Sequence, residues 1–209
     1  QGFGMSAALA VATSRAIQRA MGEEYEMSLR RSMLHAHVCE RKTSSGLGDV
    51  LGISAGGIEI RTSPGSPFSG GDLQSGPGIS RGWSNEMEVI LIWPDQRGHH
   101  TSEYIDDPLW KEKITQSGDR LLSTLEGRWG EDSWIDLISC ARSFVEEKGL
   151  LDDSSRMDLL KMVEDSITKS DQDAVASLCL LGRSIIVTKK RLESEVDFDA
   201  VMLEIRNTG

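Results

Sequence analysis

The sequence has few cysteines, a shortage of positive charge and no long hydrophobic run. Its cysteines, Cys39, Cys140 and Cys179, are odd in number and widely spaced, which argues against a disulfide framework and suits reduced intracellular thiols. Lys and Arg number 23 against 33 Asp and Glu. The net charge of -10 argues against a broad binding surface for nucleic acid or anionic membrane. Without a bilayer-length apolar segment or a signal peptide, we expect a cytoplasmic protein.

Glycine directly before an alanine-rich helix is the most informative feature that is present. The segment Gly2–Ala8 reads G-F-G-M-S-A-A, and a helix is predicted from about Ser6 to Met21. Glycine lets the backbone approach a ligand, and a helix N-terminus offers free N–H groups to an anion. The segment is neither a Walker loop, because no Lys-Ser/Thr follows, nor G-x-G-x-x-G, because Ala7 replaces the third glycine. From its residues alone, the segment could be either a phosphate-binding loop or the start of a small-residue helix packed on a sheet.

His35, His37 and Cys39 raise the question of a metal site. They fall in a second predicted helix, Tyr25 to Arg41, where positions two apart point in different directions. A packed or solvated helix face is therefore favoured over a metal site.

The rest of the chain alternates predicted strands and helices. Strand Ile58–Arg61 is followed by an irregular connector, Thr62–Asn85, which is rich in proline and glycine, and then by the continuously apolar Glu88–Trp93, typical of a central strand. Further helices are predicted at Pro108–Thr115, Asp119–Leu125, Ser133–Glu147, Ser155–Thr168 and Asp171–Leu181, and strands at Ser184–Thr188 and Ala200–Ile205. Helices between separated strands favour an α+β fold with helices on one face of an antiparallel sheet.

Two segments carry a resemblance to a known family. Gly2–Ala8 is similar to the second motif, G-L-G-S-S-A-A, of the GHMP small-molecule kinases, and Ser45–Asp49 resembles their later S-G-x-D segment. In that family six residues separate the Asp from a Gly-Gly pair, and here Val50–Ala55 fill that interval. The wording of both segments, with Leu181–Ser184, is most similar to the archaeal pantoate kinase branch. The family's first motif, P-G-x-[ILV], has no counterpart in the chain.

The resemblance implies a fold and an activity. The expected fold is a two-domain α/β sandwich. Residues 1–85 would form an incomplete N-terminal ATP-binding domain that resembles a domain of ribosomal protein S5, and residues 86–209 would form the C-terminal α+β domain. The activity is ATP- and Mg²⁺-dependent phosphorylation of a small hydroxy acid, with pantoate in archaeal coenzyme A biosynthesis as the expected substrate. Another GHMP kinase, for shikimate or in the mevalonate pathway, and a non-catalytic nucleotide- or metabolite-binding module are the alternatives.

The resemblance also assigns roles to residues. Asp49 would accept or polarise the proton of the substrate hydroxyl, and Ser6 and Glu40 would bind Mg²⁺. Taken without the resemblance, Ser6 is equally a helix cap, Asp49 is more often a turn cap, and Glu40 is a solvated helix-end carboxylate. The nucleotide is expected at Gly2, Phe3, Gly4, Met5, Ser6 and Ala7, and the substrate at His37, Ser44, Ser45 and Gly46.

The expected partners are the small hydroxy acid and one protein surface, with no nucleic acid or membrane. Residues 1–85 contain two apolar-faced helices but one credible strand. Uncovered helix faces of several hundred Å² mark an interaction surface or an aggregation hazard. We therefore expect Ala8–Met21 and Leu29–Val38 to be covered by a missing β-rich N-terminal segment or by a second copy in a homodimer.

Overall fold

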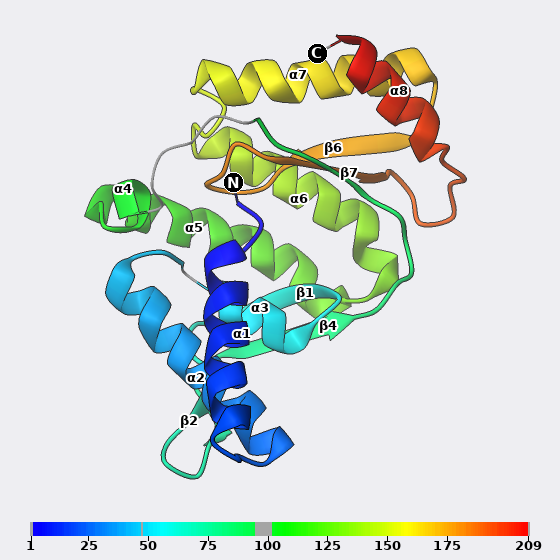
Figure 1. The fold of residues 1–209 in the computed structure, drawn as a ribbon. Helices are drawn as coiled ribbons and strands as arrows, with labels where there is room; N and C mark the ends of the chain where they lie inside the picture. The colour runs from blue at the N-terminus through cyan, green and yellow to red at the C-terminus, as the bar shows by residue number, and fades with distance from the viewer. Residues whose placement is uncertain (1, 47, 95–101, 209) are drawn as a thin grey trace. The chain divides into compact units, whose positions relative to one another are not determined.

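The computed structural model describes all residues except 1, 47, 95–101 and 209 (Figure 1). It forms two compact units, each considered by itself below: the N-terminal unit, Gly4–Asn85 with His100–Lys111, and the C-terminal unit, Gln1–Phe3 with Glu86–His99 and Glu112–Gly209. Helices are combined with small antiparallel sheets, a mixed fold compatible with the expected α+β GHMP-like class. Within the described residues, no helix is both long and apolar enough to cross a bilayer.

Two long helices, α1 (Met5–Ala20) and α2 (Tyr25–Thr43), lie side by side in the N-terminal unit (Figure 1). The short helix α3 (Asp49–Ala55) packs on both. Small side chains at the contact bring the helix backbones close together, which places the start of α1 near the end of α2 and the start of α3. The buried cluster between them consists of Ala7, Val11, Met33, Ala36 and Val50.

Strands occupy part of the segment predicted to be an irregular connector. Strand β1 (Ile58–Ser63) pairs antiparallel with β4 (Ile79–Trp83), and β2 (Phe68–Ser69) pairs with β3 (Gln74–Ser75) between them. The connector prediction was therefore wrong for three short strands. Proline and glycine mark the turns of this segment, whereas pairing along the chain, which local composition does not reveal, orders the residues between the turns.

The C-terminal unit contains a three-stranded antiparallel sheet with the order β5-β7-β6. Its strands are β5 (Ile90–Ile92), β6 (Ala174–Leu178) and β7 (Ile185–Lys189), and helices α6 and α7 both pack against β6. Beyond β5, helix α4 (Ser102–Ile105) and the first residues of α5 (Pro108–Leu125) belong to the N-terminal unit. The helices and 3₁₀ turns that follow in the C-terminal unit are η1 (Glu126–Arg128), η2 (Glu131–Ser133), α6 (Trp134–Glu147), α7 (Ser154–Ser170) and α8 (Phe198–Thr208).

Two predictions for this unit were wrong: a predicted helix contains a strand, and a predicted strand is helical. The predicted helix Asp171–Leu181 contains strand β6, in which buried and half-buried residues alternate with a period of two. The predicted strand Ala200–Ile205 lies within helix α8, because Phe198 and Val201 are buried three positions apart and the Asp197 carboxylate accepts a hydrogen bond from the Ala200 amide.

Two further predictions need smaller corrections. The run Glu88–Trp93 was expected to be a central strand, but β5 has three residues and lies at the edge of the sheet. The predicted helices Pro108–Thr115 and Asp119–Leu125 are one continuous helix, α5, because the intervening Gly118 is accommodated within the helix without breaking it.

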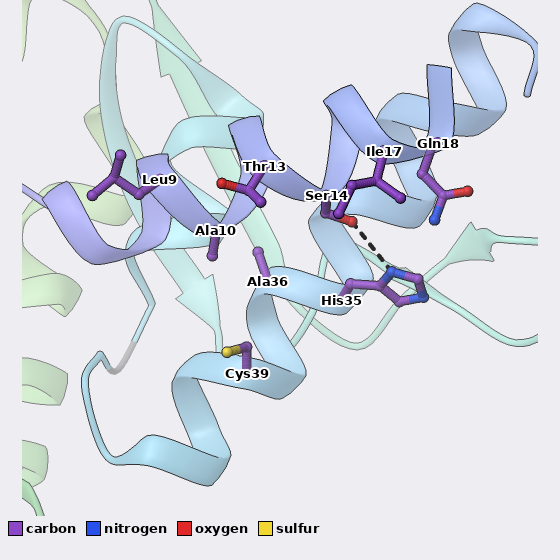
Figure 2. Close-up of a pocket in the computed structure, with 9 residues that line it drawn as sticks. All are labelled: Leu9, Ala10, Thr13, Ser14, Ile17, Gln18, His35, Ala36 and Cys39. Atoms are coloured by element: carbon purple, nitrogen blue, oxygen red, sulfur yellow. Dashed lines mark hydrogen bonds between the residues drawn. The ribbon is translucent and has the colours of Figure 1, made fainter. Parts of the chain in front are cut away.

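An apolar face of α1 and α2 is exposed within the described structure. The side chains of Leu9, Ile17 and Val38 are 61%, 55% and 41% exposed. A groove of about 540 Å³ lies between the two helices, and a 3.2 Å hydrogen bond joins Ser14 Oγ and His35 Nδ1 in its lining. Figure 2 shows the side chains that line it. The expected partner for this face stays a prediction.

We expect this face to be covered in solution, because an open apolar groove of this size is unfavourable in water. Cys39 lines the groove and is exposed there, so its thiol reports on the cover. A maleimide should label Cys39 much more slowly in the native protein than after denaturation, as followed by peptide mass spectrometry. Protection lost on dilution would indicate a second copy, and native labelling at the denatured rate would contradict the expectation.

Candidate active site

The hydroxyl of Ser6 and the carboxylate of Glu40 meet between α1 and α2. Ser6 lies in the first turn of α1, and its Oγ donates a 2.6 Å hydrogen bond to Glu40 Oε1. Gly4, not Ser6, is the N-cap of the helix, and it adopts the left-handed conformation with φ 62° that glycine accommodates without a steric penalty. The simple capping interpretation of Ser6 is therefore wrong, because its hydroxyl is directed at an acid 34 residues away.

The Glu40 side chain is buried although it belongs to the last turns of a surface helix. The residue is 3% exposed, so the alternative of a solvated helix-end carboxylate is wrong. Its Oε1 accepts hydrogen bonds from Ser6 and Ser45, whereas its buried Oε2 has no hydrogen-bond partner among the described residues. A buried carboxylate oxygen without a partner is costly, and a hard cation is a chemically fitting partner for it. This donor set fits a Mg²⁺ ion.

Asp49 is the first residue of α3 and lies beside the start of α1. A Cβ built on Gly4 would lie 3.6 Å from the Asp49 Cβ. The Asp49 side chain is therefore next to Gly4, the N-cap of α1. Burial raises the pKa of Asp49, the Arg61 cation opposes this, and the nearby Glu40 and Glu59 carboxylates add to the increase. A carboxyl group with a raised pKa in such surroundings has the character of a proton acceptor.

Arg61, on β1, is a site residue that the sequence interpretation missed. Its Nη1 lies 3.8 Å from Asp49 Oδ1, while its Nε donates a 2.7 Å hydrogen bond to Glu59 Oε1. Glu59 and Arg61 are two positions apart on a strand and thus share a face. The available signal was the alternation Ile-Glu-Ile-Arg, but it does not reveal that this polar face is turned toward Asp49.

Four residues at the end of α2 were predicted to contact substrate, and the structure gives them different surroundings. Ser45 donates a 2.9 Å hydrogen bond to Glu40 Oε1, and Gly46 is buried against the same carboxylate. Ser44 Oγ instead donates to Asp106 Oδ1 at 2.9 Å. His37 is half-buried, and burial followed by the Arg41 cation lowers its pKa, which keeps the imidazole neutral over a wider pH range.

The predicted phosphate segment is divided between the two units. Gly4 to Ala7 belong to the N-terminal unit, whereas Gly2 and Phe3 belong to the C-terminal unit. There a Cβ on Gly2 would lie 2.5 Å from the Cys179 carbonyl, and the Phe3 ring packs edge-on against Trp93 at 5.8 Å. Their role in nucleotide binding stays a prediction. Leu47 of the S-G-x-D segment lies outside the described residues.

The alternative metal site at His35, His37 and Cys39 gains no support. Across the described part of the chain, no three His, Cys, Asp or Glu side chains are grouped to hold a metal ion. His35 is instead engaged with Ser14 in the groove.

Comparison with known proteins gives one informative match. The chain is 31% identical over 194 residues to the protein named pantoate kinase from Thermococcus kodakarensis. This similarity supports a pantoate-kinase-like relationship. The match covers 93% of this chain but 57% of the length of that pantoate kinase, so the chain spans somewhat more than half of it. No family model matches the chain, and no solved structure matches it.

The raised pKa of Asp49 predicts a pH-dependent effect on stability. Because the folded-state pKa lies above the unfolded one, the ionised carboxylate disfavours the folded state once the pH passes through the raised value. Relative to the parent, Asp49→Asn should therefore unfold at a higher urea concentration at neutral pH, and the difference should shrink under acidic conditions. Asp72→Asn, at an exposed turn position, is the control. An Asp49→Asn protein less stable than the parent at neutral pH would contradict the assignment.

Proposed function

We propose that the chain is the catalytic part of a GHMP-type kinase that transfers the γ-phosphoryl group of ATP to the hydroxyl of a small hydroxy acid, with pantoate as the acceptor. The observation that carries this proposal is the convergence of Ser6, Glu40 and Asp49. They come from three separate helices and lie in one compact unit. The similarity to pantoate kinase supports the same reaction.

The start of α1 would bind the nucleotide phosphates. The first intrahelical bond of this helix runs from the Ala8 amide to the Gly4 carbonyl at 3.0 Å. The earlier amides of the turn, Met5 to Ala7, have no intrahelical acceptor and lie at the positive end of the helix dipole.

Ser6 and Glu40 would hold Mg²⁺, an ion that prefers oxygen ligands and neutralises negative charge on transferring phosphates. The buried Glu40 carboxylate supplies a negative charge whose second oxygen lacks a partner in the described structure. Ser6 already contacts this carboxylate, so the hydroxyl and the acid act from the same place.

Asp49 would accept the proton of the acceptor hydroxyl. Its raised pKa makes it a stronger base than an ordinary surface aspartate, while the Arg61 cation favours its ionised form. Arg61 also supplies a guanidinium beside the base, a group suited to binding the carboxylate of a hydroxy acid. An acceptor held by Arg61 would thus present its hydroxyl close to Asp49.

The role of Asp49 predicts a selective loss of turnover. In the active protein, Asp49→Asn should lower kcat by about 10²–10⁴, the usual contribution of general base catalysis. The affinity for ATP should be nearly unchanged, because Asn occupies the same volume and the phosphate contacts come from α1. Steady-state kinetics and nucleotide titration measure the two effects, with Asp72→Asn as the matched control. A kcat within tenfold of the parent would remove Asp49 from the catalytic role.

The acceptor is tested separately with a panel of alcohols. Pantoate, mevalonate, shikimate and homoserine, each supplied with Mg-ATP, should differ in kcat/KM, and pantoate should be the preferred acceptor. A preference for any other alcohol would rule out pantoate as the main substrate, but it would not contradict the proposed phosphotransferase activity. Nucleotide binding without phosphorylation of any member would favour the non-catalytic binding module.

A further inference from the structure

Glu40 is held in place by the turn that follows its own helix. Ser44 ends α2 in the left-handed conformation with φ 50°, which reverses the chain as at many helix C-termini. After this reversal, the Ser45 amide donates to the Glu40 carbonyl at 3.1 Å, and the Ser45 hydroxyl donates to Glu40 Oε1 at 2.9 Å. The same turn therefore contacts both the backbone and the carboxylate of Glu40.

Gly46 completes this arrangement by leaving space. A Cβ built at Gly46 would lie 1.9 Å from Glu40 Oε2 and 2.8 Å from its Cδ, so the Glu40 side chain would have to move. No left-handed conformation demands glycine here, because Gly46 is not among the residues with positive φ. The requirement for glycine thus comes from the carboxylate itself. Its second oxygen occupies the volume in which a side chain at position 46 would begin.

We propose that Ser45 and Gly46 are positioning residues that fix the Glu40 carboxylate for the metal ion, and that they do not contact the hydroxy acid. This inference rests on the proposed function. It reassigns the first half of the S-G-x-D segment from substrate recognition to the metal site, while Asp49 in the second half performs the proton transfer. One short segment then serves both parts of the phosphoryl transfer.

The position of the clash predicts which property Gly46→Ala changes. The colliding atoms are the far end of a flexible side chain and not backbone, so rotation of Glu40 can relieve the contact without unfolding α2. The rotation moves Glu40 away from the hydroxyl donors Ser6 and Ser45. We therefore expect Gly46→Ala to fold normally and to lose the placement of the metal-binding carboxylate.

The experiment measures Mn²⁺ binding directly, by electron paramagnetic resonance titration of the full-length protein in the presence of ADP. Gly46→Ala and Ser45→Ala should weaken Mn²⁺ binding by about 10–100-fold, as is usual when groups that orient a metal ligand are removed. Ser45→Thr keeps a hydroxyl donor and should bind Mn²⁺ nearly as the parent does. Gly71→Ala is the matched glycine control, because a Cβ there meets nothing within 4 Å.

Two further readouts separate this role from the alternatives. The melting temperature of Gly46→Ala should match that of Gly71→Ala, and at saturating Mg²⁺ its KM for the hydroxy acid should equal that of the parent. Unchanged Mn²⁺ affinity with a raised hydroxy-acid KM would overturn the inference and restore a substrate-binding role, while leaving the proposed kinase intact. A parent protein that binds no Mn²⁺ with ADP would overturn the proposed metal site and this inference together.

Discussion

A single buried carboxylate constrains the candidate site of the N-terminal unit. Glu40 is 3% exposed, and burial of a carboxyl group is unfavourable unless hydrogen bonds or a counter-ion compensate it. Compensation comes from two separate places in the sequence, Ser6 at the start of α1 and Ser45 after the end of α2. The crossing of α1 and α2 is therefore tied to the same carboxylate that would bind the metal. Any change that displaces α1 also removes a donor from Glu40.

The acid-base part of the site balances opposing charges. Asp49 lies near two other carboxylates, Glu40 and Glu59, which disfavour its ionised form. Arg61 offsets this repulsion and is itself held by Glu59, so the guanidinium stays between two acids. The glycines of the neighbouring turn make this possible, since a Cβ on Gly48 would lie 2.8 Å from Arg61 Nη1. Glycine in this turn thus leaves room for the charged side chains in the positions that they occupy.

The sequence was sufficient for features that depend on local pattern. Helices α1, α2, α6 and α7 follow from apolar residues at helical spacing, and the motif resemblance identified the residue types of the site. It was insufficient where pairing or burial decided the outcome. Strand β4 exists through its partner β1, and Ala174–Leu178 is a strand because of the sheet beside it. Arg61 was missed for the same reason, because the side of β1 that faces Asp49 is set by tertiary packing.

The surroundings of the residues expected to contact substrate were the least predictable feature, since they depend on segments that are distant in sequence. The residues predicted from proximity to the motif, Ser44 to Gly46, turn out to differ in their partners although they are consecutive. Ser44 is joined to Asp106, 62 positions away, whereas Ser45 is turned inward to Glu40. The left-handed backbone at Ser44 causes this divergence by reversing the chain between them. Consecutive residues therefore contact different parts of the N-terminal unit, and the backbone conformation at one position decides which.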